Sequence, residues 1–165
     1  MISSASPTDS ERPAGESVPV PSDRLSSGPR SRPLRALVVE DAADSRELFA
    51  SELESAGFIV ARASSGEEAL AQAREFEADV IVLDLMLPGV NGFTVARAMR
   101  SSEKHRDVAI LAVTALASDA MRRMALEAGC DAVLCKPVVA SVVVDEAHLL
   151  VESRWHDTSA KGSRH

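Results

Sequence analysis

Several polar residues able to bind metal or act as a nucleophile each follow a short aliphatic run of this 165-residue chain. They are Glu40, Asp41, Asp84, Thr114 and Lys136. If those runs are parallel strands, these side chains converge at one edge of a sheet. Two carboxylates about 4 Å apart repel by about 4 kcal/mol at an effective dielectric of 20, so three together require a cation. Oxygen ligands with room for water select Mg²⁺ or Mn²⁺.

Five aliphatic segments are predicted to be the strands that position these residues. They are Leu34–Val39, Phe58–Ala61, Val80–Leu83, Val108–Val113 and Ala132–Leu134. The third and fourth are continuously apolar, as is typical of strands covered on both faces.

Amphipathic stretches after the strands are predicted to be helices. In the first, Asp44 and Glu47 are expected to form a capping box, with Leu48 and Leu53 facing inward. Ser65 and Glu68 predict the same device for the second. Apolar residues at helical spacing mark the third and fourth, namely Phe93, Ala96 and Met99, then Met121, Met124, Leu126 and Ala128. The methionines are expected to fill the core.

The ends of the last two helices are predicted from composition. Gly129 is expected to end the fourth helix in the left-handed conformation. The fifth is expected from about Ser141 to Arg154, followed by a short polar tail at residues 154–165. Five strands alternating with five helices predict an α/β fold with a doubly wound, mainly parallel sheet.

The charge and composition differ along the chain. Nine serines and six prolines among residues 1–33 predict a disordered extension, whereas residues 34–153 carry 20 acidic and 11 basic side chains. An acidic body repels nucleic acid and anionic membrane surfaces, so neither is an expected partner.

The two cysteines and the N-terminal residues indicate the cellular compartment of the protein. Cys130 and Cys135 lack the spacing of a disulfide framework and are expected to be buried, packed thiols in a reducing compartment. No signal peptide or membrane span is visible, which favours a cytoplasmic protein.

The motifs around the polar residues resemble those of the receiver domain of two-component response regulators. They are Leu37-Val-Val-Glu-Asp41, Val80-Ile-Val-Leu-Asp-Leu-Met-Leu-Pro-Gly-Val-Asn-Gly92, Ala112-Val-Thr-Ala115 and Cys135-Lys-Pro137. The resemblance implies a flavodoxin-like receiver fold over residues 34–153, with a cis peptide bond in the Lys136-Pro137 loop.

The resemblance also implies a role for each residue. Asp84 is the implied phosphoacceptor, and Thr114 and Lys136 contact the phosphoryl group. The implied Mg²⁺ ligands are Glu40, Asp41, Asp84 and the carbonyl of Met86. A stand-alone receiver of this kind takes its phosphoryl group from a sensor histidine kinase or a histidine phosphotransfer protein, binds a downstream protein target, and is not an enzyme for a diffusible substrate.

One position departs from the family, and two alternatives stay open. Val133 stands where the family usually carries Tyr or Phe, which favours a phosphorylation-independent interaction module on the same fold. A small Mg-dependent phosphohydrolase with an Asp nucleophile is the enzymatic alternative. It normally needs a second acid close behind the nucleophile, and Leu85-Met86-Leu87 supplies none.

Overall fold

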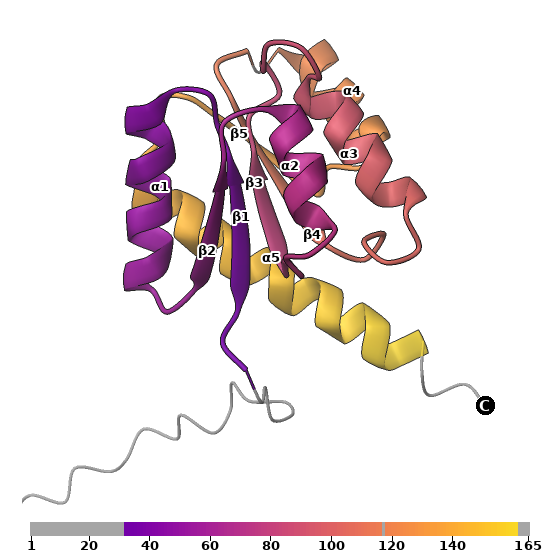
Figure 1. Cartoon of the computed structure of the whole chain (residues 1–165). Coiled ribbons are helices and arrows are strands. Elements are labelled where there is room, and N and C mark those ends of the chain that lie inside the picture. Colours follow the sequence, from indigo (N-terminus) through magenta and orange to yellow (C-terminus); the bar gives the residue numbers. More distant parts are fainter. Residues whose placement is uncertain (1–31, 117, 162–165) are drawn as a thin grey trace, which may run out of the picture. The chain divides into compact units, whose positions relative to one another are not determined.

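The computed structural model describes residues 32–116 and 118–161, which contain one five-stranded parallel sheet and five helices (Figure 1). The strand order is β2-β1-β3-β4-β5. The strands are β1 (Arg35–Val39), β2 (Ile59–Ala63), β3 (Val80–Leu83), β4 (Ala109–Thr114) and β5 (Ala132–Cys135). The helices are α1 (Ala43–Ser55), α2 (Gly66–Ala73), α3 (Gly92–Ser101), α4 (Asp119–Ala128) and α5 (Ala140–Lys161). The predicted doubly wound α/β fold is confirmed.

Alternating strand residues build two cores, one on each face of the sheet. Leu37 and Ile81 pack on the face covered by α2, α3 and α4, whereas Val38 and Val82 pack on the face covered by α1 and α5 (Figure 1). Because successive side chains of a strand point to opposite faces, strands covered on both sides must be apolar throughout. This explains the unbroken apolar runs in β3 and β4.

The local helix signals were right for one helix end, right in part for a second and wrong for a third. Gly129 ends α4 in the left-handed conformation, as predicted. Ser65 Oγ accepts from the Glu68 backbone N–H, but the Glu68 carboxylate accepts from Ser64 and so does not complete the box. The capping box of Asp44 and Glu47 is wrong. α1 begins after Ala42, which offers no side-chain cap, and Glu47 instead pairs with Arg62 on β2. The distant guanidinium is a stronger partner for a carboxylate than a local N–H group.

Three side chains expected in the core lie on the surface. Leu48, Met124 and Leu126 are each about half exposed, because the stripe of α1 or α4 that faces the sheet is narrower than the apolar pattern suggests. Met99 is buried, as expected. Cys130 is buried too, but Cys135, predicted to be packed, is exposed at the end of β5.

The two predicted terminal segments have different outcomes. α5 continues to Lys161, so the residues expected to form a polar tail after Arg154 are helical that far. The predicted disordered extension at residues 1–33 lies almost wholly outside the described residues. Within the described ranges, no helix combines the length and apolar character needed to cross a membrane.

Candidate functional site

Strand register brings the predicted site residues to one edge of the sheet, which we call the carboxyl edge. Val39 is paired with Leu83, so Glu40 and Asp84 follow neighbouring strands at the same level. On the other side, Thr114 is paired with Cys135, and the Lys136 backbone N–H donates to the Thr114 carbonyl at 2.8 Å. Since all strands are parallel, the chain leaves each of them at this edge.

The acidic residues form a tight group, Glu40, Asp41 and Asp84, which we call the acidic cluster. One carboxylate oxygen from each lies within 4.8 Å of the others. Glu40 is 2% exposed and Asp84 is 7% exposed, whereas Asp41 is open to solvent. The two buried carboxylates repel each other strongly because little water screens them, and the exposed Asp41 adds a weaker, screened repulsion.

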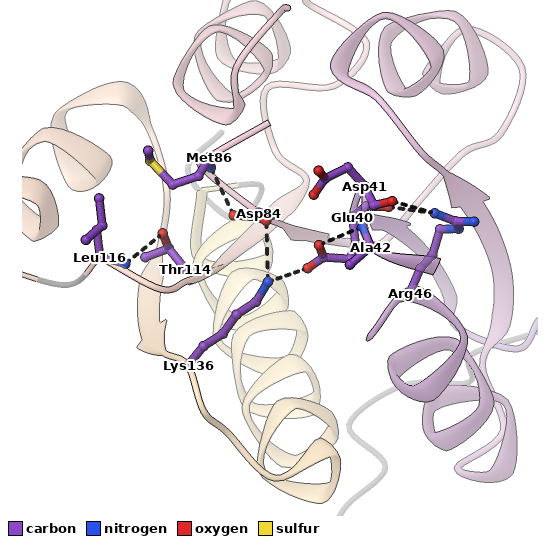
Figure 2. A network of polar contacts seen from close by, with 9 residues as sticks. All are labelled: Glu40, Asp41, Ala42, Arg46, Asp84, Met86, Thr114, Leu116 and Lys136. Carbon is purple, nitrogen blue, oxygen red and sulfur yellow. Dashed lines mark hydrogen bonds and ion pairs between the residues drawn. The ribbon is translucent and has the colours of Figure 1, made fainter. Parts of the chain in front are cut away.

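Lys136 supplies positive charge to the acidic cluster (Figure 2). Its Nζ donates to Glu40 Oε2 at 2.6 Å and to Asp84 Oδ2 at 3.4 Å. Burial, the largest single influence, lowers the pKa of Lys136, but the hydrogen bond to Glu40 and the charges of Asp84 and Glu40 together raise it above its ordinary value. Lys136 is therefore a permanent cation at neutral pH.

The pKa of Glu40 reflects its burial within the acidic cluster. Burial raises its pKa above the ordinary value, and the hydrogen bonds from Lys136 and from the Ala42 backbone N–H offset only part of that effect. Asp84 raises it further through charge repulsion. The ionised form of Glu40 therefore needs more positive charge than Lys136 provides.

Asp84 is held in a fixed orientation at the end of β3. Its Oδ1 accepts from the Met86 backbone N–H at 2.9 Å, while its Oδ2 faces Lys136 (Figure 2). A Cβ atom at Gly92, at the start of α3, would collide with the Asp84 carbonyl oxygen. Gly92 therefore lets α3 begin close against the backbone that carries this carboxylate.

Thr114 ends β4 and is fully buried. Its Oγ1 accepts from the Leu116 backbone N–H at 3.4 Å, a long hydrogen bond that ties the hydroxyl to the loop leading into α4. The Lys136-Pro137 peptide bond is cis, as the resemblance implied.

The acidic cluster fits a hard divalent cation. It offers three carboxylate oxygens close together, and among residues 32–116 and 118–161 only Lys136 forms an ion pair with it. The Asp41 carboxylate accepts no hydrogen bond from any described residue and is open to a ligand. Such an all-oxygen donor set, partly exposed to water, suits Mg²⁺ better than Zn²⁺.

Sequence reasoning missed one residue beside the site. Arg46, in the first turn of α1, reaches back with Nη1 to the carbonyl oxygens of Glu40 at 2.9 Å and Asp41 at 3.5 Å (Figure 2). The signal that the sequence offered was the position of Arg46, five residues after Asp41. That spacing does not predict the contact, because every residue has a backbone carbonyl that could accept the hydrogen bond.

Comparisons with known proteins identify the family. The family model described as the response regulator receiver domain matches residues 36–148. The polar-differentiation response regulator DivK of Brucella ovis is 35% identical over 102 residues, which cover 62% of this chain and 83% of DivK.

Solved structures agree with this assignment. A putative response regulator from Chloroflexus aurantiacus superposes with a TM-score of 0.70 and 30% identity, covering 73% of this chain and 99% of that one. The chemotaxis response regulator CheY4 of Vibrio cholerae gives 0.68 and 27% identity, covering 71% and 98%. With the polar residues that resemble the family's motif gathered at the carboxyl edge, the chain belongs to the response regulator receiver domains of two-component signalling.

Proposed function

We propose that this protein accepts a phosphoryl group on Asp84 from a phosphohistidine and thereby changes the surface it offers to another protein. The observation that carries the proposal is the position of Asp84. Its carboxylate lies between Lys136 and two further carboxylates, at the edge of the sheet where parallel α/β folds bind ligands. The same residues resemble the family's motif and lie within the range that the family model matches.

The chemical step is a transfer between a nitrogen and an oxygen. An Asp84 carboxylate oxygen forms a bond to phosphorus while the bond from phosphorus to the donor's imidazole nitrogen breaks, and that nitrogen keeps the electron pair. The backbone N–H of Met86 holds the carboxylate in place, and Lys136 offsets charge on the phosphoryl oxygens. The products are an acyl phosphate on this chain and a free histidine on the donor.

The acidic cluster holds Mg²⁺ in this proposal. Glu40, Asp41 and Asp84 would bind it with the carbonyl of Met86. When bound, Mg²⁺ would supply positive charge that offsets the negative charge of the reacting groups. The buried position of Glu40 and its raised pKa support this role, because among the described residues only Lys136 forms an ion pair with the three carboxylates.

In this proposal, phosphorylation changes the protein's surface through Thr114 and the loop that follows it. The Thr114 hydroxyl is tied only weakly to Leu116, so it can turn toward a phosphoryl group on Asp84 and draw that loop with it. The partners are a sensor histidine kinase or a histidine phosphotransfer protein upstream and a protein target downstream. The protein has no turnover on a diffusible substrate.

The phosphoacceptor is tested by mass. Purified protein incubated with Mg²⁺ and a small acyl phosphate is expected to gain one phosphoryl group, and Asp84→Asn is expected to gain none. Omitting Mg²⁺ from the wild-type reaction should abolish the gain. Labelling of Asp84→Asn at the wild-type level would refute the assignment.

One observation favours the phosphorylation-independent module as a second candidate. Val133, at the position of the family's aromatic residue, is buried, and its carbonyl accepts from Arg122 Nη1 at 3.2 Å. β5 therefore presents no aromatic side chain there that could move on phosphorylation. A pull-down that recovers the same partners with phosphorylated protein and with Asp84→Asn would favour this candidate.

A further inference from the structure

Arg46 uses its side chain in an unusual way for a surface arginine. Its Nη1 donates to the Glu40 carbonyl oxygen at 2.9 Å and, in a long hydrogen bond, to the Asp41 carbonyl oxygen at 3.5 Å (Figure 2). Within the described part of the chain it forms no ion pair. A carboxylate would be the stronger acceptor for this guanidinium, because a charged acceptor makes the stronger hydrogen bond. Among the described residues, however, the only carboxylate on which the charge of Arg46 is seen to act is Glu68, whose pKa is lowered mainly by hydrogen bonds from Ser64 and to a smaller extent by Arg46. Arg46 holds the backbone of the two residues and leaves their carboxylates free.

The segment between β1 and α1 needs such a tie. Ala42 is the N-cap of α1 and supplies no side-chain hydrogen bond, so no local cap fixes how the chain turns into the helix. Other contacts in this segment are the Glu40 backbone N–H to the Ala63 carbonyl at 3.1 Å and the Ala42 backbone N–H to Glu40 Oε1 at 3.2 Å. No contact of the Asp41 backbone other than that from Arg46 is seen among the described residues.

We infer that Arg46 is a positioning residue for the divalent cation: it fixes the backbone of Glu40 and Asp41 so that their carboxylates face Asp84. This inference rests on the proposed Mg²⁺ site and adds to it a residue that touches neither the cation nor the phosphoryl group. Partners that orient metal ligands commonly change metal affinity by tenfold or more when they are removed.

The direction in which cation affinity changes when Arg46 is removed distinguishes this role from a purely electrostatic effect. Removing a positive charge that lies against the backbone of Glu40 and Asp41 should strengthen cation binding if charge alone matters. If Arg46 positions the ligands, removing it should weaken binding despite the more negative field. The two explanations therefore predict opposite changes in the dissociation constant.

The experiment titrates the full chain with Mn²⁺ and follows free Mn²⁺ by electron paramagnetic resonance. Arg46→Met is expected to bind Mn²⁺ about tenfold more weakly than the wild type. Arg62→Met is the matched control. Arg62 lies on β2 and pairs with Glu47 and Glu54 of α1, but no ion pair between it and the acidic cluster is seen among the described residues. This variant is expected to bind Mn²⁺ as well as the wild type or slightly better.

Folding is checked separately by thermal unfolding without metal. If Arg46→Met does not fold, Arg46→Gln is titrated instead, since its shorter side chain also loses both carbonyl contacts. Binding by the folded variant that equals or exceeds that of the wild type overturns the role of Arg46.

A parallel titration of Asp41→Asn separates this inference from the function proposed above. Weak binding by Asp41→Asn with wild-type binding by the Arg46 variant overturns Arg46 alone. Wild-type binding by Asp41→Asn overturns the metal site, and the role of Arg46 with it.

Discussion

The two edges of the sheet differ in how completely their carboxylates are paired with basic side chains. At the edge where the strands begin, which we call the amino edge, Asp131 is paired with two arginines and Asp79 with one. At the carboxyl edge, a cluster of three carboxylates has one lysine beside it, which pairs with two of them. Both edges are built from residues adjoining strands, so the difference lies in the balance of charge.

Asp131, just before β5, shows how the amino edge is balanced. Its Oδ2 accepts from Arg100 at 2.9 Å and from the Ile110 backbone N–H at 2.8 Å, and its Oδ1 accepts from Arg154. These bonds join α3, the start of β4, β5 and α5. This partly buried carboxylate therefore has its charge balanced by two arginines and links four elements of the fold.

Asp79, just before β3, has the same design. It accepts two hydrogen bonds from Arg32 at 3.0 Å and one from the Arg35 backbone N–H at 2.8 Å. The amino edge therefore stabilises the fold, while the unbalanced carboxyl edge is left for a ligand. An uncompensated cluster of buried charge is a mark of function, because folding alone would select against it.

The largest contrast between the edges is expected in the reactivity of their cysteines. Burial, with a smaller effect from Asp131, raises the pKa of the Cys130 thiol to about 12, while Cys135 is exposed beside Lys136. At pH 8 the Cys130 thiol is protonated and shielded, so we expect iodoacetamide to label Cys135 at least about 100-fold faster.

Peptide mass spectrometry measures both labelling rates. Unfolding in urea should make the two cysteines react alike, and Cys135→Ser should leave the native protein almost unlabelled. Equal labelling rates in the native protein would contradict the burial of Cys130.

The next largest effect is expected from breaking the amino edge. Asp131→Ala removes the shared acceptor of Arg100, Arg154 and the Ile110 backbone N–H. We expect the free energy of unfolding to fall by about 2 to 3 kcal/mol, less than for a fully buried pair because these side chains keep some contact with water. Urea unfolding measures the change.

The control for this variant is Glu127→Ala on the exposed face of α4, which should change the free energy of unfolding by less than about 0.5 kcal/mol. A loss for Asp131→Ala no larger than that of the control would show that the amino edge does not stabilise the fold.

The smallest effect is expected at the carboxyl edge, with the opposite sign. Asp41→Asn removes repulsion with Glu40 and Asp84 and loses no hydrogen bond of its carboxylate, so without divalent cations the free energy of unfolding should rise by about 0.5 to 1 kcal/mol. Added Mg²⁺ should stabilise the wild type and leave the variant unchanged.

Urea unfolding in chelator and in Mg²⁺ tests both parts of this prediction. Glu52→Gln makes the same change of charge on exposed α1 and should keep the response to Mg²⁺. A variant less stable than the wild type in chelator would mean that the acidic cluster is not under repulsion.

Much of the fold was predictable because its signals are local. The Ser65 cap and the left-handed Gly129 depend on a few neighbouring residues, and the apolar runs of β3 and β4 follow from burial on both faces. The cap predicted at Asp44 failed because Glu47 found a partner on β2. Local rules hold only where no distant group competes.

The sequence was enough to predict which residues form the candidate site, but not which groups they contact. Glu40, Asp84 and Lys136 could be named because each follows an aliphatic run, and parallel strands bring such positions to one edge. The contact of Arg46 could not be named, because its acceptors are backbone carbonyls. The exposure of Cys135 was missed because an aliphatic run does not show where a strand leaves its helical cover.

The amino-acid sequence by itself determined which chemical groups this protein gathers, since the alternation of strands and helices fixes the edge at which strand-ending residues meet. Only the tertiary structure decided how those groups share their charge. Lys136 meets Glu40 across 96 residues of chain, and Asp131 takes the arginines of α3 and α5. Electrostatic energy depends on distance and burial in space, and neither is written in the order of the residues.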